Sequence, residues 1–97
     1  MTELAERLRD ELKGYPQTRD KLTYILNTND RALRQAVNEL RKEGIPVCSN
    51  SGVSGYWIGD NKDIQHTVAD LKSRAYDLLA QANGMEGELD GQVEWRL

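Results

Sequence analysis

Six basic and amide side chains recur at helical spacing between residues 31 and 42 of this 97-residue chain. Arginine pairs well with guanine, asparagine and glutamine pair with adenine, and lysine or arginine binds phosphate. The spacing places the six on one face of a helix, which predicts a surface for duplex DNA. They are Arg31, Arg34, Gln35, Asn38, Arg41 and Lys42. The alternative interpretation is a polar helix face that only meets water.

The neighbouring residues predict where this helix begins, ends and packs. The side-chain oxygen of Asn29 suits an N-cap, and Asp30 adds negative charge at the positive end of the helix dipole. Gly44 supplies the left-handed residue with which many helices end. Four apolar residues form the inward stripe: Leu33, Ala36, Val37 and Leu40.

The segments on either side predict two further helices and a β-hairpin. Residues 3–13 and 18–27 have helical spacing, with Thr18 as the cap of the second helix. After Gly44, residues 45–50 and 55–58 have the character of two strands around a polar turn. This order predicts an α+β, mainly helical domain over residues 1–59, with three helices and a hairpin wing.

Residues 18–58 resemble the winged helix-turn-helix of the biotin-repressor and deoxyribonucleoside-regulator type. The resemblance rests on Asn29-Asp30-Arg31, the Leu33/Val37/Leu40 stripe, residues 39–47 and Gly55-Tyr56. It implies a bacterial or phage protein that regulates transcription or assists replication or recombination. It also implies that the third helix enters the major groove of DNA. By position, Arg31, Arg34, Gln35 and Asn38 would face bases, while Arg41 and Lys42 would reach phosphates. The wing tip, residues 50–54, departs from basic wings because it has no lysine or arginine.

The net charge of −3 is unevenly distributed. Residues 1–59 hold nine Lys or Arg and eight Asp or Glu, which gives +1, whereas residues 60–97 hold four and eight, which gives −4. DNA binding depends on the potential at the contacting face rather than on the total. A local charge of +1 predicts modest affinity for each subunit and favours binding as a dimer.

Residues 60–84 predict a fourth helix with an apolar heptad seam that ends at Gly84. The proposed dimerisation residues are Ile64, Val68, Leu71, Ala75 and Leu78, with Ala82 continuing the spacing. Because three helices and a hairpin already close a small core, we expect this seam to form a homodimer, parallel or antiparallel. The alternative is a helix that packs onto its own domain.

Residues 85–97 predict an acidic tail. Glycines and acids over residues 85–91 favour a mobile linker, and Val93, Trp95 and Leu97 then alternate as in a strand. We expect Trp95 to pack on its own domain or its dimer mate, and the tail also suits a further protein partner.

An enzyme is not expected, and neither a catalytic residue, a metal site nor a cofactor is assigned. His66 is the one histidine, Cys48 is the one cysteine, and no phosphate loop or Cys/His metal spacing occurs. No apolar run approaches the ~20 residues of a membrane span, so we expect a cytoplasmic protein. The alternative function is a winged-helix protein-interaction module that does not bind DNA directly.

Overall fold

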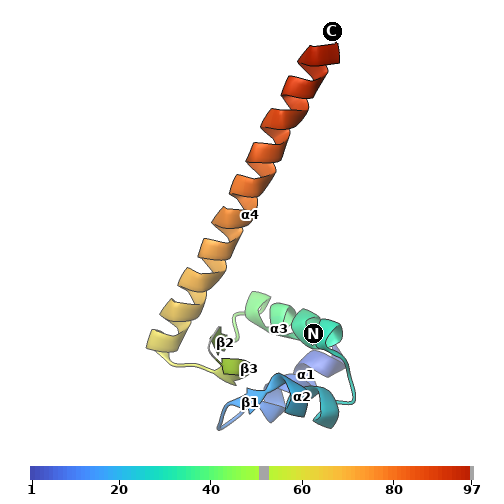
Figure 1. The fold of residues 1–97 in the computed structure, drawn as a ribbon. Coiled ribbons are helices and arrows are strands. Elements are labelled where there is room, and N and C mark those ends of the chain that lie inside the picture. Colours follow the sequence, from blue (N-terminus) through green and yellow to red (C-terminus); the bar gives the residue numbers. More distant parts are fainter. Residues whose placement is uncertain (51–52, 97) are drawn as a thin grey trace. The chain divides into compact units, whose positions relative to one another are not determined.

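A computed structural model describes the backbone of residues 1–50 and 53–96 and the side chains of residues 1–49 and 55–88. The chain is α+β and mainly helical, as predicted (Figure 1). The elements run α1 (Glu3–Glu11), β1 (Gln17–Thr18), α2 (Arg19–Ile25), α3 (Asp30–Lys42), β2 (Val47–Asn50), β3 (Val53–Ile58) and α4 (Asn61–Arg96). The chain divides into two units, Met1–Thr67 and Val68–Leu97.

The core of the first unit is formed by α1, α2, α3 and one side of the hairpin. The predicted inward stripe of α3 is confirmed, since Leu33 and Leu40 are fully buried and Ala36 and Val37 are at most 3% exposed. The remaining buried core residues are Ala5, Leu8, Leu12, Leu22, Leu26, Val47 and Tyr56. The three helices therefore share one hydrophobic core with the hairpin.

The predicted caps of α2 and α3 are confirmed. The Thr18 hydroxyl accepts a hydrogen bond from the backbone N–H of Lys21 at 3.2 Å, and Asn29 Oδ1 accepts one from the backbone N–H of Ala32 at 2.9 Å. Gly44 has a φ of 89°, which is the left-handed conformation expected at the end of α3. Local side-chain chemistry thus fixes both ends of the helix that carries the proposed site.

The sheet has the order β1-β3-β2, with both pairs antiparallel. The hairpin of β2 and β3 was predicted, whereas β1 was not, because Gln17–Thr18 is too short to show a strand period. Gly55 lies opposite Thr18, and a Cβ at Gly55 would lie 2.5 Å from the Gln17 carbonyl oxygen. Glycine therefore permits β1 to approach the hairpin. The predicted wing tip lies partly outside the described residues, at 51–52.

Helix α4 differs from its prediction. Its N-terminus is capped, because Asp60 accepts a hydrogen bond from the Asp63 backbone N–H at 3.0 Å and Asp63 accepts one from the Asp60 backbone N–H at 3.3 Å. The predicted stop at Gly84, the linker over residues 85–91 and the strand-like end are wrong, since the helix continues to Arg96. A helical glycine costs only about 1 kcal/mol relative to alanine, so Gly84 does not by itself end a helix. The side chain of Trp95 lies outside the described residues.

The start of the chain is tied to α3 through a carboxylate. The hydroxyl and the backbone N–H of Thr2 donate hydrogen bonds to Glu39 at 2.8 and 2.7 Å. These bonds hold the pKa of Glu39 below its ordinary value of 4.5. The ionised carboxylate therefore stabilises the position of α1 against α3.

We expect Glu39→Gln to flatten the acid limb of the stability curve. Because the folded pKa of Glu39 lies below its ordinary value of 4.5, its contribution is present above that pH and is lost as the pH falls through the folded pKa. Denaturant unfolding at pH 7 and at successive values below 4.5 measures this. Wild type should lose more stability than the variant over that interval, and equal losses would contradict the role of Glu39.

Candidate nucleic-acid interface

The outer face of α3 is a continuous polar stripe. Five of the six predicted side chains are exposed: Arg31, Arg34, Gln35, Asn38 and Lys42. At 1.5 Å per residue the stripe extends over about 16 Å of helix, and an α-helix about 10–12 Å in diameter fits a major groove about 12 Å wide. The buried Leu33–Leu40 stripe on the opposite side anchors α3, so these side chains project from a rigid element.

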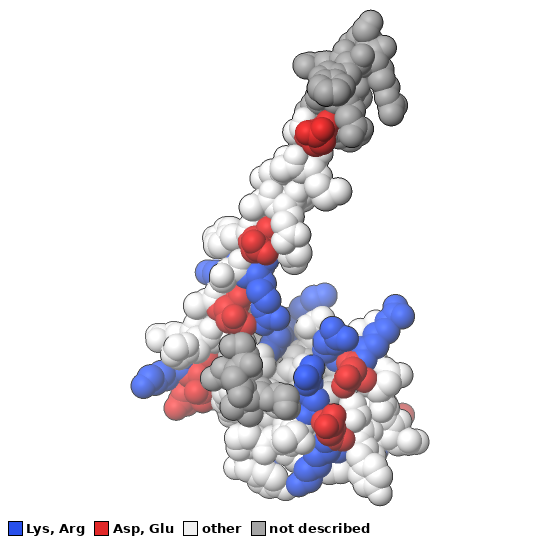
Figure 2. Space-filling view, in the orientation of Figure 1, with Lys and Arg blue, Asp and Glu red and all other residues white. Residues whose placement is uncertain are grey.

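The basic side chains have acidic neighbours. On the face of the first unit that Figure 2 presents, lysine and arginine side chains are interleaved with aspartate and glutamate. The interleaving agrees with the net charge of +1 for residues 1–59. Because positive and negative charges alternate, the electrostatic potential of this surface is weak. We therefore expect specific hydrogen bonds to contribute more to DNA binding than general attraction to the phosphates.

Arg41 differs from the other five because it bonds the hairpin. Its Nε donates to the Val47 carbonyl at 2.8 Å, and its Nη2 donates to the Ser49 hydroxyl at 3.1 Å. The residue is half-buried. The resemblance assigns Arg41 to phosphate; in the structure its hydrogen bonds hold β2 against the C-terminal end of α3.

Thr67 also holds β2, a role that no local pattern around residue 67 indicates. Its hydroxyl accepts from the Ser49 backbone N–H and donates to the Ser49 carbonyl, both at 3.4 Å, and the residue is 5% exposed. Ser49 is thus bonded by Arg41 on one side and by the first turns of α4 on the other. The wing is therefore braced at a fixed position beside the polar stripe.

Arg41→Ala and Lys42→Ala should differ in their effect on stability, because Arg41 is hydrogen-bonded to β2 and Lys42 is exposed. We expect Arg41→Ala to lower the free energy of unfolding by about 1–2 kcal/mol, because two hydrogen bonds to β2 are lost. Lys42→Ala, at an exposed position, should change it by less than ~0.5 kcal/mol. Urea unfolding of both variants measures this, and equal stability of the two would show that the Arg41 bonds contribute little.

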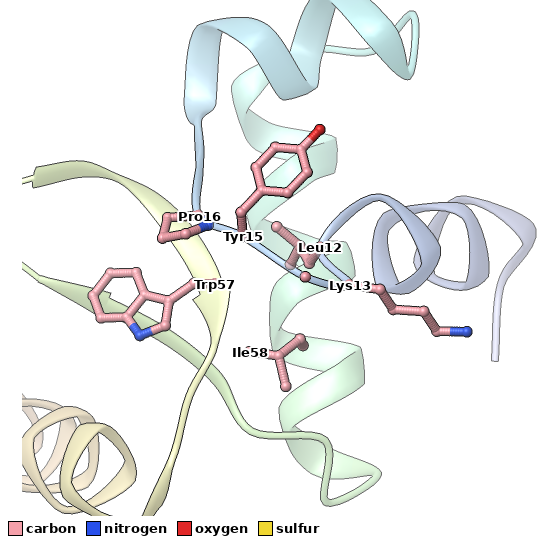
Figure 3. A pocket seen from close by; sticks show the side chains of 7 residues that line it. Leu12, Lys13, Tyr15, Pro16, Trp57 and Ile58 are labelled. Carbon is pink, nitrogen blue, oxygen red and sulfur yellow. The ribbon is translucent and has the colours of Figure 1, made fainter.

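A shallow pocket of about 380 Å³ lies where the α1–β1 loop meets β3 (Figure 3). It is lined by Leu12, Lys13, Gly14, Tyr15, Pro16, Trp57 and Ile58. The Lys21 ammonium lies 5.8 Å from the centroid of the Tyr15 ring, a cation–π contact at the rim. These lining residues offer apolar surface and one ammonium group, and they include no acid, histidine, serine or cysteine.

The part of the chain that the structure describes has few groups that could form a catalytic or metal site. His66 is exposed on α4, and Cys48 is buried in β2 as an apolar strand residue. Among the described residues, no three His, Cys, Asp or Glu side chains gather as a metal site would require. The helices of this same part include none with the length and apolar character needed to cross a membrane.

The fold and the stripe together have the arrangement of a winged helix: three helices, a braced hairpin and a polar outer face on the third helix. No family model, curated protein or solved structure matches the chain. The likeness of residues 18–58 to the winged helix-turn-helix therefore rests on the residues themselves.

Proposed function

We propose that this protein binds double-stranded DNA through the outer face of α3. The observation that carries the proposal is the exposed stripe from Arg31 to Lys42 on the third helix of a helix-turn-helix arrangement. In this role the protein is a small cytoplasmic regulator of transcription, or an accessory in replication or recombination, in a bacterium or phage. It acts by binding rather than as an enzyme.

The proposed mode of binding places α3 in the major groove. Arg34 then donates to the acceptors of guanine, and Gln35 and Asn38 pair with adenine. Lys42, at the last turn of α3, reaches a phosphate, which sets register without reading sequence. Arg41 contributes through the wing that it braces as well as through its charge.

We also propose that the protein binds DNA as a homodimer through α4. Several apolar side chains of this helix are largely exposed, including Val68 at 41% and Leu78 at 64%. Pairing two copies would bury this surface and would double the phosphate contacts of a weakly basic unit. Symmetric dimers read two half-sites separated by whole helical turns of DNA.

One observation favours a second candidate, a winged-helix protein-interaction module. The pocket between residues 12–16 and 57–58 exposes Tyr15, which is 58% accessible, beside Trp57. Aromatic side chains in a shallow apolar pocket are typical of protein-binding surfaces. In this candidate function the pocket, and not the α3 stripe, would engage the partner.

Fluorescence anisotropy with a labelled random-sequence duplex at several salt concentrations distinguishes the two functions. Direct DNA binding should weaken steeply as salt increases, because bound counterions are released from the phosphates. The wild-type protein should bind duplex at 50 mM salt, and Trp57→Ala should bind equally well. Absence of duplex binding at low salt would contradict the proposal and favour the interaction module.

A further inference from the structure

The continuation of α4 past Gly84 lengthens its apolar seam. Met85 follows Ala82 by three residues, so the 4-3-4-3 spacing that begins at Ile64 extends another position. Met85 is 75% exposed, and Leu78 is 64% exposed. Two glycines in this region, Gly84 and Gly87, fall on the side away from the seam, and a Cβ at either would meet open space. The glycines therefore leave the seam uninterrupted.

The positions that flank the seam are basic near its middle and acidic near its C-terminal end. Lys72 and Arg74 lie on either side of the seam near its middle, and Glu86 and Glu88 occupy the same two flanks two heptads later. All four side chains are exposed. Arg74 also bonds Asp70 of its own helix at 2.7 Å, an exposed pair of the kind that contributes only tenths of a kcal/mol. Flanking charges of this kind set the orientation of paired helices.

We propose that α4 pairs with α4 of a second copy in an antiparallel coiled coil, with Ala75 facing Met85 and Leu78 facing Ala82 of the other copy. This inference rests on the homodimer of the proposed function and adds its orientation and register. Antiparallel helices bring equivalent flanks together. The register therefore places Lys72 opposite Glu86 and Arg74 opposite Glu88, and the two-fold axis repeats both pairs.

A parallel pair would leave these charges without partners. In parallel coiled coils one flank meets the opposite flank of the next heptad, which would set Arg74 against Leu79 and Glu86 against Gln81. Identical residues would also lie at the same level, so the two acidic ends would adjoin. Like charges placed so near to each other are destabilising.

The sizes of the seam residues favour the same orientation independently. Small and large residues alternate along its centre, with Ala75 and Ala82 at one heptad position and Leu78 and Met85 at the other. Antiparallel packing sets one heptad position against the other, so every central layer combines a small with a large side chain. Parallel packing would instead alternate layers of two alanines with layers of two large residues, which fill space unevenly.

In this register the N-terminal ends of the two α4 helices lie far apart. Ile64 of one copy would lie level with residue 96 of the other, so the two Ile64 positions would be about 48 Å apart along the axis at 1.5 Å per residue. A parallel pair would place both starts together at one end.

Cysteine cross-linking tests the orientation without DNA. In a Cys48→Ala background, Ala75→Cys and Met85→Cys are made singly and together, and each protein is oxidised mildly. The double variant should form a covalent dimer, whereas the single variants should not, because equivalent residues would be ~15 Å apart along the axis. Cross-linking of the single variants would show a parallel pair. Failure of the double variant, while sedimentation shows a dimer, would overturn the register.

Charge reversal provides a second test with a matched control. Lys72→Glu with Arg74→Glu should raise the dimer dissociation constant roughly tenfold or more at low salt, since four pairs become repulsive. Adding Glu86→Lys and Glu88→Lys to the same chain should restore most of the wild-type affinity, because all four pairs between the copies are re-formed with their signs exchanged, whereas the exposed Arg74–Asp70 pair within each helix is not. A fourfold variant as weak as the double variant would overturn the proposed pairs. A monomeric wild type in these sedimentation runs would overturn the homodimer, whereas duplex binding is judged separately by anisotropy.

Discussion

Arg34→Ala should weaken binding to a selected DNA site by about 1–3 kcal/mol, or roughly 5- to 150-fold. Arg34 is exposed near the centre of the α3 stripe, on a helix whose opposite face is fully anchored by Leu33 and Leu40. A guanidinium held there can bond both acceptors of one guanine, and alanine leaves them unpaired. Anisotropy titrations with a site obtained by selection from random duplex measure the loss.

Arg34→Lys is the matched control for charge. Lysine keeps the positive charge but lacks the planar fork that bonds a base edge twice. If Arg34 reads a base, the lysine variant should keep most of its affinity for random duplex and lose much of its preference for the selected site. Full preference in the lysine variant would assign Arg34 to phosphate, and unchanged affinity in Arg34→Ala would exclude the α3 face.

Leu71→Glu combined with Leu78→Glu should give folded monomers. In the proposed dimer both residues face the second copy, and four buried carboxylates would abolish pairing. Sedimentation at tens of micromolar should show a dimer for wild type and a monomer for the variant. Circular dichroism should show that Met1–Thr67 remains folded, since its core residues are unchanged.

Tyr76→Glu is the control for adding charge to α4. Tyr76 is 69% exposed and lies off the seam, so its replacement should leave the dimer intact. Global unfolding of the Leu71/Leu78 variant would show that α4 packs onto its own domain. A monomeric wild type would instead remove the dimer from the proposed function, while leaving the α3 surface to be tested by itself.

The elements that the sequence predicts well are those fixed by neighbouring residues. Asn29 and Thr18 cap the helices that follow them, and Gly44 ends α3 in the left-handed conformation. The Leu33–Leu40 stripe determines which side of α3 is buried, and therefore which side is exposed. Most of the candidate surface follows from that one helix.

The elements that the sequence misses depend on distant contacts or on small energies. Strand β1 exists because Gly55 lets it approach β3, which no local pattern reveals. The bonds of Arg41 to Val47 and Ser49 of β2 connect separate elements, so the helical spacing of α3 does not indicate them. Gly84 was assigned as a helix end, whereas its helical cost of about 1 kcal/mol is small enough for the surrounding helix to continue.

The most direct test of the central claim is to map the DNA contact onto the protein. Nuclear magnetic resonance of the ¹⁵N-labelled chain, titrated with the selected duplex, reports the change at each backbone amide. DNA binding through α3 predicts the largest shifts at residues 31–42, with much smaller ones around Tyr15 and Trp57. Largest shifts at residues 12–16 and 57–58, or none along α3 at saturating duplex, would contradict the proposed interface.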